Sequence, residues 1–198
     1  MSRFLPALSL LVLAACAPEV GDGHVAATVS PVVATAQAAR TRAAPIDITT
    51  STLRARAAKI TATHDLVFED WSGTLDVVGD EVRGVAVTVQ IAGMKADQEK
   101  LTGHLQSADF FDAARFPTAS FQSSAITPEV GPAGATHLVT GTMNIHGVDK
   151  QLSFPATLNG RRLTAEFVLD RQDFGVAYPG MPDDLIQDDV LLTIDLRG

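Results

Sequence analysis

The stretch "TMNIHGVDKQLSFPATLNGRRLTAEF", residues 142–167, decides the fold class of this chain. Apolar and polar residues alternate along it with a period of two, which is typical of β-strands that bury one face. "HGVD" and "LNGRR" interrupt the alternation, and both favour tight turns. Short turns join antiparallel neighbours, so the stretch predicts successive β-hairpins.

The same alternation continues over most of the chain. "GVAVTVQI", residues 84–91, places three valines and an isoleucine on one face, and "VLLTIDL", residues 190–196, places Val, Leu, Ile and Leu on one face. Further strands are predicted at residues 46–53, 59–64, 72–78, 118–126, 137–145, 152–158 and 164–170. About eight short strands with close turns predict an all-β sandwich or barrel.

A single segment has a helical pattern. In "ADQEKLTGHLQ", residues 96–106, Leu101 and Leu105 share one face and Asp97 is a candidate N-cap. Gly103 weakens the pattern, so we expect a short helix. The segment that follows, residues 107–121, holds four of the nine phenylalanines in irregular sequence. These rings either form an aromatic lid at one end of the barrel or complete its core.

Length and charge restrict the function. A chain of 198 residues forms one domain with a substantial core. It carries 15 Lys and Arg against 23 Asp and Glu, a net charge of −8. Because it lacks a basic footprint, we expect no nucleic-acid partner and no attachment to anionic lipid through charge.

The N-terminus, "MSRFLPALSLLVLAACAP", has the positive and then apolar plan of a secretory signal, and its apolar run is too short to span a bilayer. Residues 13–16 resemble the lipobox of bacterial lipoproteins, and Cys16 is the only cysteine of the chain. We therefore predict a signal peptide over residues 1–15, lipid attachment at Cys16, a flexible tether over residues 16–45 and a folded domain over residues 46–198. The alternative is an ordinary signal peptide in which Cys16 has no role.

Catalytic and metal-binding motifs are missing from the sequence. It contains no G-x-S-x-G, no H-E-x-x-H and no Gly-rich phosphate loop, and its five histidines are scattered. The acidic run "MPDDLIQDD", residues 181–189, does not have the spacing of an EF-hand loop. His146 falls in the "HGVD" turn, where a hydrogen bond that stabilises the turn is expected in place of metal ligation. We expect no enzymatic activity, no metal site and no required cofactor.

Five segments resemble the YceI-like family, whose members are periplasmic bacterial proteins of lipocalin-like fold that bind polyisoprenoid lipids. They are "SGTL" at residues 72–75, "HLQSADFFDAARFPTASF" at residues 104–121, "VTGTMNIHGVDKQLSFPATL" at residues 139–158, "DRQDFGV" at residues 170–176 and "QDDVLLTIDLRG" at residues 187–198. They occur in the family's order and together cover residues 46–198.

The resemblance implies an eight-stranded antiparallel lipocalin-like β-barrel, with the short helix and the Phe-rich segment near its mouth. A quinone, a polyprenyl chain or another long isoprenoid-type lipid would lie inside, and the protein would sequester or shuttle it at the cell envelope. The expected apolar lining is Trp71, Leu75, Val87, Val89, Ile91, Leu101, Phe110, Phe111, Phe116, Phe121, Met143, Ile145, Phe154, Phe167, Leu169, Phe174, Leu192 and Ile194.

Polar contacts to the ligand head group are expected from His64 and His104, with paired structural roles for the two histidines as the alternative. A phosphate head would need one of the cations Arg83, Lys95, Lys100 or Arg115 at the mouth. The lipid anchor would place the protein on the periplasmic side of the envelope. Because Ala17 and not Asp follows the cysteine, the outer membrane is the expected destination.

A second function class stays open at this point. A barrel of eight strands is at the size where its interior either fills with side chains or keeps room for one ligand. Periodicity does not decide between the two, since both need apolar residues facing inward. A filled barrel would be a membrane-tethered interaction module without catalytic activity, and it would dock an envelope membrane protein.

Overall fold

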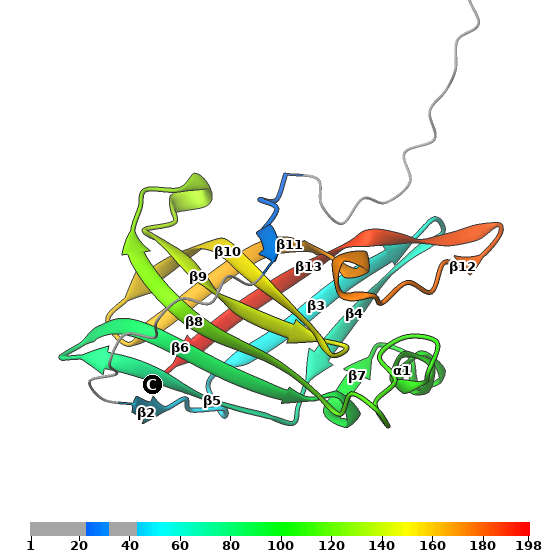
Figure 1. Cartoon of the computed structure of the whole chain (residues 1–198), viewed down its shortest axis with the longest axis horizontal. Coiled ribbons are helices and arrows are strands. Elements are labelled where there is room, and N and C mark those ends of the chain that lie inside the picture. Colours follow the sequence, from blue (N-terminus) through cyan, green and yellow to red (C-terminus); the bar gives the residue numbers. More distant parts are fainter. Residues whose placement is uncertain (1–22, 32–42) are drawn as a thin grey trace, which may run out of the picture.

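One antiparallel sheet, curled into a half-barrel, makes up most of the protein (Figure 1). The structure is a computed structural model that describes residues 23–31 and 43–198. Neighbouring strands follow the order β2-β5-β6-β8-β9-β10-β11-β13-β3-β4-β7, with β1 paired to β10 and β12 to β13. The all-β lipocalin-like prediction is confirmed, but nine of the described strands have seven or more residues, where eight strands were expected.

The elements have these bounds: β1 Thr28–Pro31, β2 Ala43–Pro45, β3 Thr52–Lys59, β4 Ala62–Phe68, β5 Trp71–Val78, β6 Glu81–Gln90, β7 Met94–Ala96, α1 Glu99–Gln106, β8 Thr118–Pro128, β9 His137–Ile145, β10 Val148–Asn159, β11 Arg162–Asp170, β12 Gly180–Met181 and β13 Asp184–Arg197. Short 3₁₀ turns lie at η1 Ile91–Gly93, η2 Pro132–Gly134 and η3 Arg171–Phe174.

The two hairpins predicted from residues 142–167 are present. Ile145 pairs with Val148 across a turn in which His146 and Gly147 both have positive φ, of 53° and 74°. Two positive φ values in a two-residue turn match the right-handed twist of the flanking strands. His146 does lie in the turn, but its ring packs edge-on against Phe116, with 4.5 Å between ring centroids.

Two of the strand predictions have the wrong bounds. Residues 47–50 form a turn, in which Asp47 accepts a hydrogen bond of 2.9 Å from the backbone N–H of Thr49, so β3 begins only at Thr52. Ile60 and Thr61 make the turn between β3 and β4, where a strand had been expected. Because Ile60 is apolar, the alternation of apolar and polar residues continues through the turn, and the sequence pattern does not show where β3 ends.

The helix is shorter than predicted and lacks the predicted cap. It begins at Glu99, and the N-cap position is held by Gln98 without a side-chain hydrogen bond. The Asp97 carboxylate instead lies 3.0 Å from Nδ1 of His64 on β4. A partner on a neighbouring strand has therefore drawn the carboxylate away from the helix end.

Part of the predicted tether belongs to the sheet. β10 and β11 pair directly over only three residue pairs. Beyond these, β1 pairs with β10, while the Ala27 N–H donates to the Val168 carbonyl on β11 at 2.8 Å and the Val168 N–H donates to Val25 at 2.9 Å (Figure 1). The segment 25–31 thus occupies a split between β10 and β11, and its Val29 packs on the main core.

The prediction of an unstructured tether is therefore wrong for residues 25–31, and also for β2, which pairs with β5. The physical reason is that the open edges of β10 and β11 leave backbone donors and acceptors that need partners. The predicted signal peptide, residues 1–15, Cys16, and the tether residues 17–22 and 32–42 lie outside the described residues.

The ion pair between Asp195 on β13 and Arg162 on β11 should stabilise the sheet in a pH-dependent way. Both Asp195 carboxylate oxygens accept a hydrogen bond of 2.8 Å from Arg162, and this contact, with Arg197, lowers the pKa of Asp195 to about 2. The folded-state pKa is depressed, so the contribution is present above the unfolded pKa near 3.8 and is lost as the pH falls through about 2.

We expect Asp195→Asn to lower the free energy of unfolding at neutral pH by about 1 kcal/mol, less than the pKa shift alone implies, because solvent screens the half-exposed Arg162. Urea unfolding of the wild type and the variant should show that the difference in unfolding free energy decreases as the pH falls below the pKa of Asp195 in the unfolded chain. It should vanish near the pKa of Asp195 in the folded protein. A difference that stays constant over that range would show that the ion pair is not its source.

Candidate ligand-binding cavity

An internal cavity of about 770 Å³ lies inside the half-barrel. Such a volume is within the range of roughly 300–1,000 Å³ that small-molecule sites occupy. Every second residue of β6 and β13 faces it, because side chains of a strand alternate between the two faces of the sheet. From these strands come Val85, Val87, Val89, Val190, Leu192, Ile194 and Leu196.

A row of phenylalanines forms part of the cavity wall. Phe121, Phe154 and Phe167 line it, with ring centroids 5.4 Å apart for the first pair and 4.2 Å for the second, which is stacked. The same rings belong to the main core, in which other side chains such as Leu75 and Leu152 are fully buried and do not line the cavity. The interior is thus partly packed and partly hollow.

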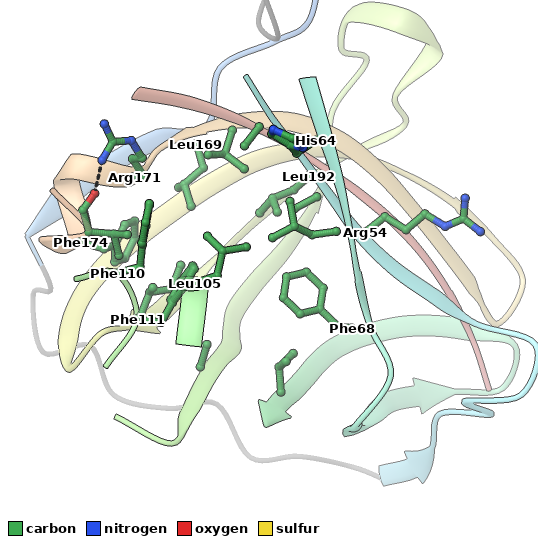
Figure 2. Close-up of a pocket in the computed structure, with 18 of the residues that line it drawn as sticks. Arg54, His64, Phe68, Leu105, Phe110, Phe111, Leu169, Arg171, Phe174 and Leu192 are labelled. Atoms are coloured by element: carbon green, nitrogen blue, oxygen red, sulfur yellow. Dashed lines mark hydrogen bonds between the residues drawn. The ribbon is translucent and has the colours of Figure 1, made fainter. Parts of the chain in front are cut away.

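Helix α1 and the Phe-rich segment cover the hollow end. Leu101 and Leu105 of α1 line the cavity together with Phe110 and Phe111 (Figure 2). The Phe110 ring lies 4.8 Å from that of Tyr178, which follows η3. The helix, the aromatic segment and the loop after η3 therefore meet over the cavity.

Small side chains keep the space between these walls open. Ala55 and Ala57 on β3 and Ala119 on β8 all line the cavity. Each stands at an inward position where a larger side chain would reach into the volume.

Fifteen of the eighteen residues expected in the apolar lining lie in it: Val87, Val89, Ile91, Leu101, Phe110, Phe111, Phe121, Met143, Ile145, Phe154, Phe167, Leu169, Phe174, Leu192 and Ile194.

The other three do not line the cavity. Trp71 and Leu75 face inward from β5, but their side chains are packed in the main core, where they are 6% and 0% exposed. Phe116 packs outside the cavity against the turn formed by His146 and Gly147. Alternation predicts which side of a strand faces inward, but not whether the inside is filled at that level, and it gives no orientation for a loop residue.

His64 and His104 both line the cavity, and each engages a carboxylate of its own. His64 Nδ1 lies 3.0 Å from Asp97, and His104 Nε2 lies 3.1 Å from Asp109. The His104 ring also packs edge-on against Phe110 at 5.0 Å and against Tyr178 at 5.1 Å.

Of the four cations expected at the mouth, only Lys100 lines the cavity. Arg83 is paired with Glu81, and Lys95 with Glu69. Arg115 lies over the Phe116 ring, 5.0 Å from its centroid.

We call the open end of the cavity the mouth, and define it by the lining residues Lys59, Gln98, Lys100, Tyr178 and Asp184. Gln98 and Lys100 are exposed at the start of α1. Lys59 forms an ion pair with Asp184, which ties the turn between β3 and β4 to the hairpin of β12 and β13.

The hydrogen bond from Lys59, followed by those from Thr61, lowers the pKa of Asp184. This carboxylate is therefore ionised and bound at the mouth. Within the acidic run of residues 181–189, Asp184 is the first residue of β13, and Asp188 accepts a hydrogen bond from Arg171.

Arg171 is a structural residue that the sequence analysis missed. Its guanidinium is buried and donates to the carbonyls of Val176 at 2.6 Å, Gln187 at 3.0 Å and Ile186 at 3.3 Å. It thereby fixes the loop after η3 against β13. A charged residue between the apolar end of β11 and Phe174, in "DRQDFGV", was the signal that could have shown it.

Over residues 23–31 and 43–198, no three His, Cys, Asp or Glu side chains gather as a metal site would need. No helix in this part of the chain is long and apolar enough to cross a membrane.

A curled antiparallel sheet around an apolar cavity, covered by a helix and an aromatic loop, defines a lipocalin-like protein. The chain belongs to the YceI-like family, because the sequence model of the YceI-like domain matches residues 44–197. A UPF0312 protein of Pseudomonas fluorescens is 31% identical over 137 residues, which are 63% of this chain and 70% of the relative. A UPF0312 protein of Pseudomonas putida is 30% identical over 62% of this chain and 69% of its own.

Solved structures share the fold. BcnA of Burkholderia cenocepacia aligns with a TM-score of 0.66 and 22% identity over 77% of this chain and 99% of its own. A polyisoprenoid binding domain from Saccharophagus degradans, implicated in plant cell wall breakdown, aligns with a TM-score of 0.59 and 16% identity over 77% and 95%. The YCEI protein of Campylobacter jejuni aligns with a TM-score of 0.52 and 21% identity, and the alignment covers 67% of this chain and 84% of that protein.

Replacing Arg171 should loosen the covering loop of the cavity. We expect Arg171→Met to lower the free energy of unfolding by about 2–4 kcal/mol, because buried carbonyls lose their donors. Amide hydrogen exchange should rise in residues 174–188 more than in β8, which Arg171 does not contact. Equal protection of the loop in both proteins would show that the loop does not depend on Arg171.

Proposed function

We propose that the protein binds one long apolar isoprenoid-type chain, such as that of a quinone or polyprenyl lipid, in the cavity and carries it at the cell envelope without modifying it. The observation that carries the proposal is the cavity of about 770 Å³ with an apolar lining. Membership of the YceI-like family, and the fold shared with a domain described as polyisoprenoid binding, support the ligand class. The filled-barrel alternative is disfavoured by the same cavity.

Solvent exclusion would supply the binding free energy. Each methylene removed from water contributes about 0.8 kcal/mol, so a few isoprene units are enough for tight binding from water. A bilayer offers the same chain an equally apolar surrounding. Transfer between membrane and cavity is then close to neutral for the tail, which suits a carrier better than a permanent store.

Filling the cavity should abolish binding without unfolding the protein. In Ala119→Phe the new ring occupies empty space, so we expect geranylgeraniol to bind at least about tenfold more weakly while the unfolding free energy changes by less than about 1.5 kcal/mol. The matched control is Ala125→Phe, because Ala125 lies exposed on the same strand. Binding would be measured by equilibrium dialysis of labelled geranylgeraniol.

Two results would overturn the proposed function. One is wild-type protein that neither takes up geranylgeraniol nor carries lipid after native purification. The other is Ala119→Phe binding as tightly as Ala125→Phe, because the ligand would then lie outside the cavity.

We further propose that Cys16 carries a lipid anchor on the periplasmic side of the envelope, in the outer membrane. The support is the lipobox-like sequence of residues 13–16. Since Val25 is hydrogen-bonded to β11, only residues 17–24 separate the anchor from the barrel. At 3.3–3.6 Å per residue, that segment reaches at most roughly 30 Å, which would hold the barrel near the membrane surface.

Removing the cysteine tests the anchor. We expect the full chain to sediment with membranes and Cys16→Ala to move to the soluble periplasmic fraction, since one residue supplies the attachment. Cys16→Ser serves as a near-isosteric second variant. Membrane association that survives both substitutions would contradict the anchor.

A further inference from the structure

We infer that the mouth of the cavity selects isoprenoids whose head group is uncharged and carries a hydroxyl or carbonyl oxygen, and disfavours the same chain ending in a phosphate. The inference rests on the proposed function, because it concerns the polar end of the ligand whose tail fills the cavity.

The mouth is the place where such a head group would lie. Gln98 and Lys100 stand at the start of α1, and Tyr178 stands in the loop after η3. The Tyr178 ring packs on that of His104, one helical turn beyond Lys100, so these side chains belong to one rim. Deeper in, the lining is aromatic and aliphatic, which leaves the polar end of a ligand at this rim.

Three carboxylates lie at the rim or directly behind it. Asp184 lines the mouth and is paired with Lys59, whereas Asp97 and Asp109 lie outside the lining, 3.0 Å and 3.1 Å from the lining histidines His64 and His104. These three carboxylates outnumber the two lysines of the mouth by one.

The two arginines that line the cavity do not change this balance. Figure 2 shows the Arg54 guanidinium pointing away from the apolar side chains, and Arg54 is exposed. Arg171 is taken up by three backbone carbonyls and by Asp188, 2.9 Å away. Neither guanidinium is available to a ligand at the mouth.

A phosphate head group would meet poor conditions here. It brings a charge of about −1.5 to −2 and is usually bound by clustered arginines or backbone donors. Among the cations that line the described cavity, Lys100 and Arg54 have neither a carboxylate in an ion pair nor a buried role, and the Arg54 guanidinium points away from the apolar lining (Figure 2). Desolvating a phosphate beside Asp184 and near Asp97 and Asp109 is unfavourable, and one exposed lysine does not offset it.

An uncharged oxygen finds suitable partners. The Gln98 amide, the Lys100 ammonium and the Tyr178 hydroxyl are hydrogen-bond donors. Within the described residues, none of these three groups donates a hydrogen bond to another side chain. Tyr178 is half-buried, and its ring is held between His104 and Phe110, so the direction of its hydroxyl is fixed before a ligand arrives.

Farnesol and farnesyl diphosphate test the inference, because they share one tail and differ only in the head group. We expect the wild-type protein to bind farnesol roughly tenfold more tightly at low ionic strength, and added salt to narrow the difference by screening the carboxylates. If the diphosphate binds as tightly as farnesol or more tightly, the inference is wrong while the proposed function stands. If neither binds, the proposed function itself fails.

Two variants separate the contribution of the rim from the general cost of a charged ligand. Asp97→Asn with Asp109→Asn removes two negative charges, so diphosphate binding should tighten roughly tenfold while farnesol binding stays within about twofold. The matched control is Asp80→Asn with Glu81→Gln, since both residues are exposed near the turn between β5 and β6, and Glu81 is paired with Arg83, which does not line the cavity, whereas Asp97 and Asp109 each contact a lining histidine. A control that tightens diphosphate binding equally would overturn the inference.

Tyr178→Phe tests the neutral side of the same rim. It keeps the ring that packs on His104 and Phe110 and removes only the hydroxyl. Farnesol should bind about three- to tenfold more weakly, as expected for the loss of one hydrogen bond, while diphosphate binding is unchanged. Unchanged farnesol binding would exclude Tyr178 as a contact of the head group.

Discussion

The row of Phe121, Phe154 and Phe167 is the constraint on which the rest of the structure depends. These rings belong to the main core, in which Leu75 and Leu152 are fully buried, and they also line the cavity. A protein of this size needs a packed core for its stability, and a hollow barrel forfeits part of it. Rings that pack against the core on one face and line the cavity on the other let the core maintain the fold while the cavity keeps its volume.

A second constraint is the split between β10 and β11. Strands that separate expose rows of N–H and C=O groups, which are costly to bury and prone to pair with other chains. The segment 25–31 satisfies both edges, with β1 on β10 and Ala27 on Val168. Because only residues 17–24 lie between this segment and the predicted anchor at Cys16, the element that fills the split would also be the one that connects the barrel to the membrane.

The sequence predicted the class of fold and most of the cavity wall, because the alternation of side chains is a property of the strand backbone. It therefore placed β6 and β13 correctly. Four features escaped it for physical reasons. Whether an inward residue such as Trp71 meets other side chains or a void depends on volumes summed over the whole barrel. The pairing of β1 depends on a split far away in the sequence, and the ring of Phe116 sits in a loop without periodicity. The role of buried Arg171 depends on which backbone carbonyls the fold brings within its reach, and the sequence does not show these.

An isoprenoid tail would have a similar free energy in the cavity and in the membrane, so the few residues of the rim would have a large influence on which lipid is bound. For the tail of an isoprenoid, both surroundings are apolar, so the wall of the cavity supplies affinity against water but little discrimination among lipids. The head group, in contrast, would leave a hydrated membrane surface and would contact Gln98, Lys100 and Tyr178, which line the mouth beside a set of ion pairs. A difference of one hydrogen bond or one charge there is comparable with the whole net free energy of transfer. Choice of ligand and ease of release would thus both be decided at the mouth.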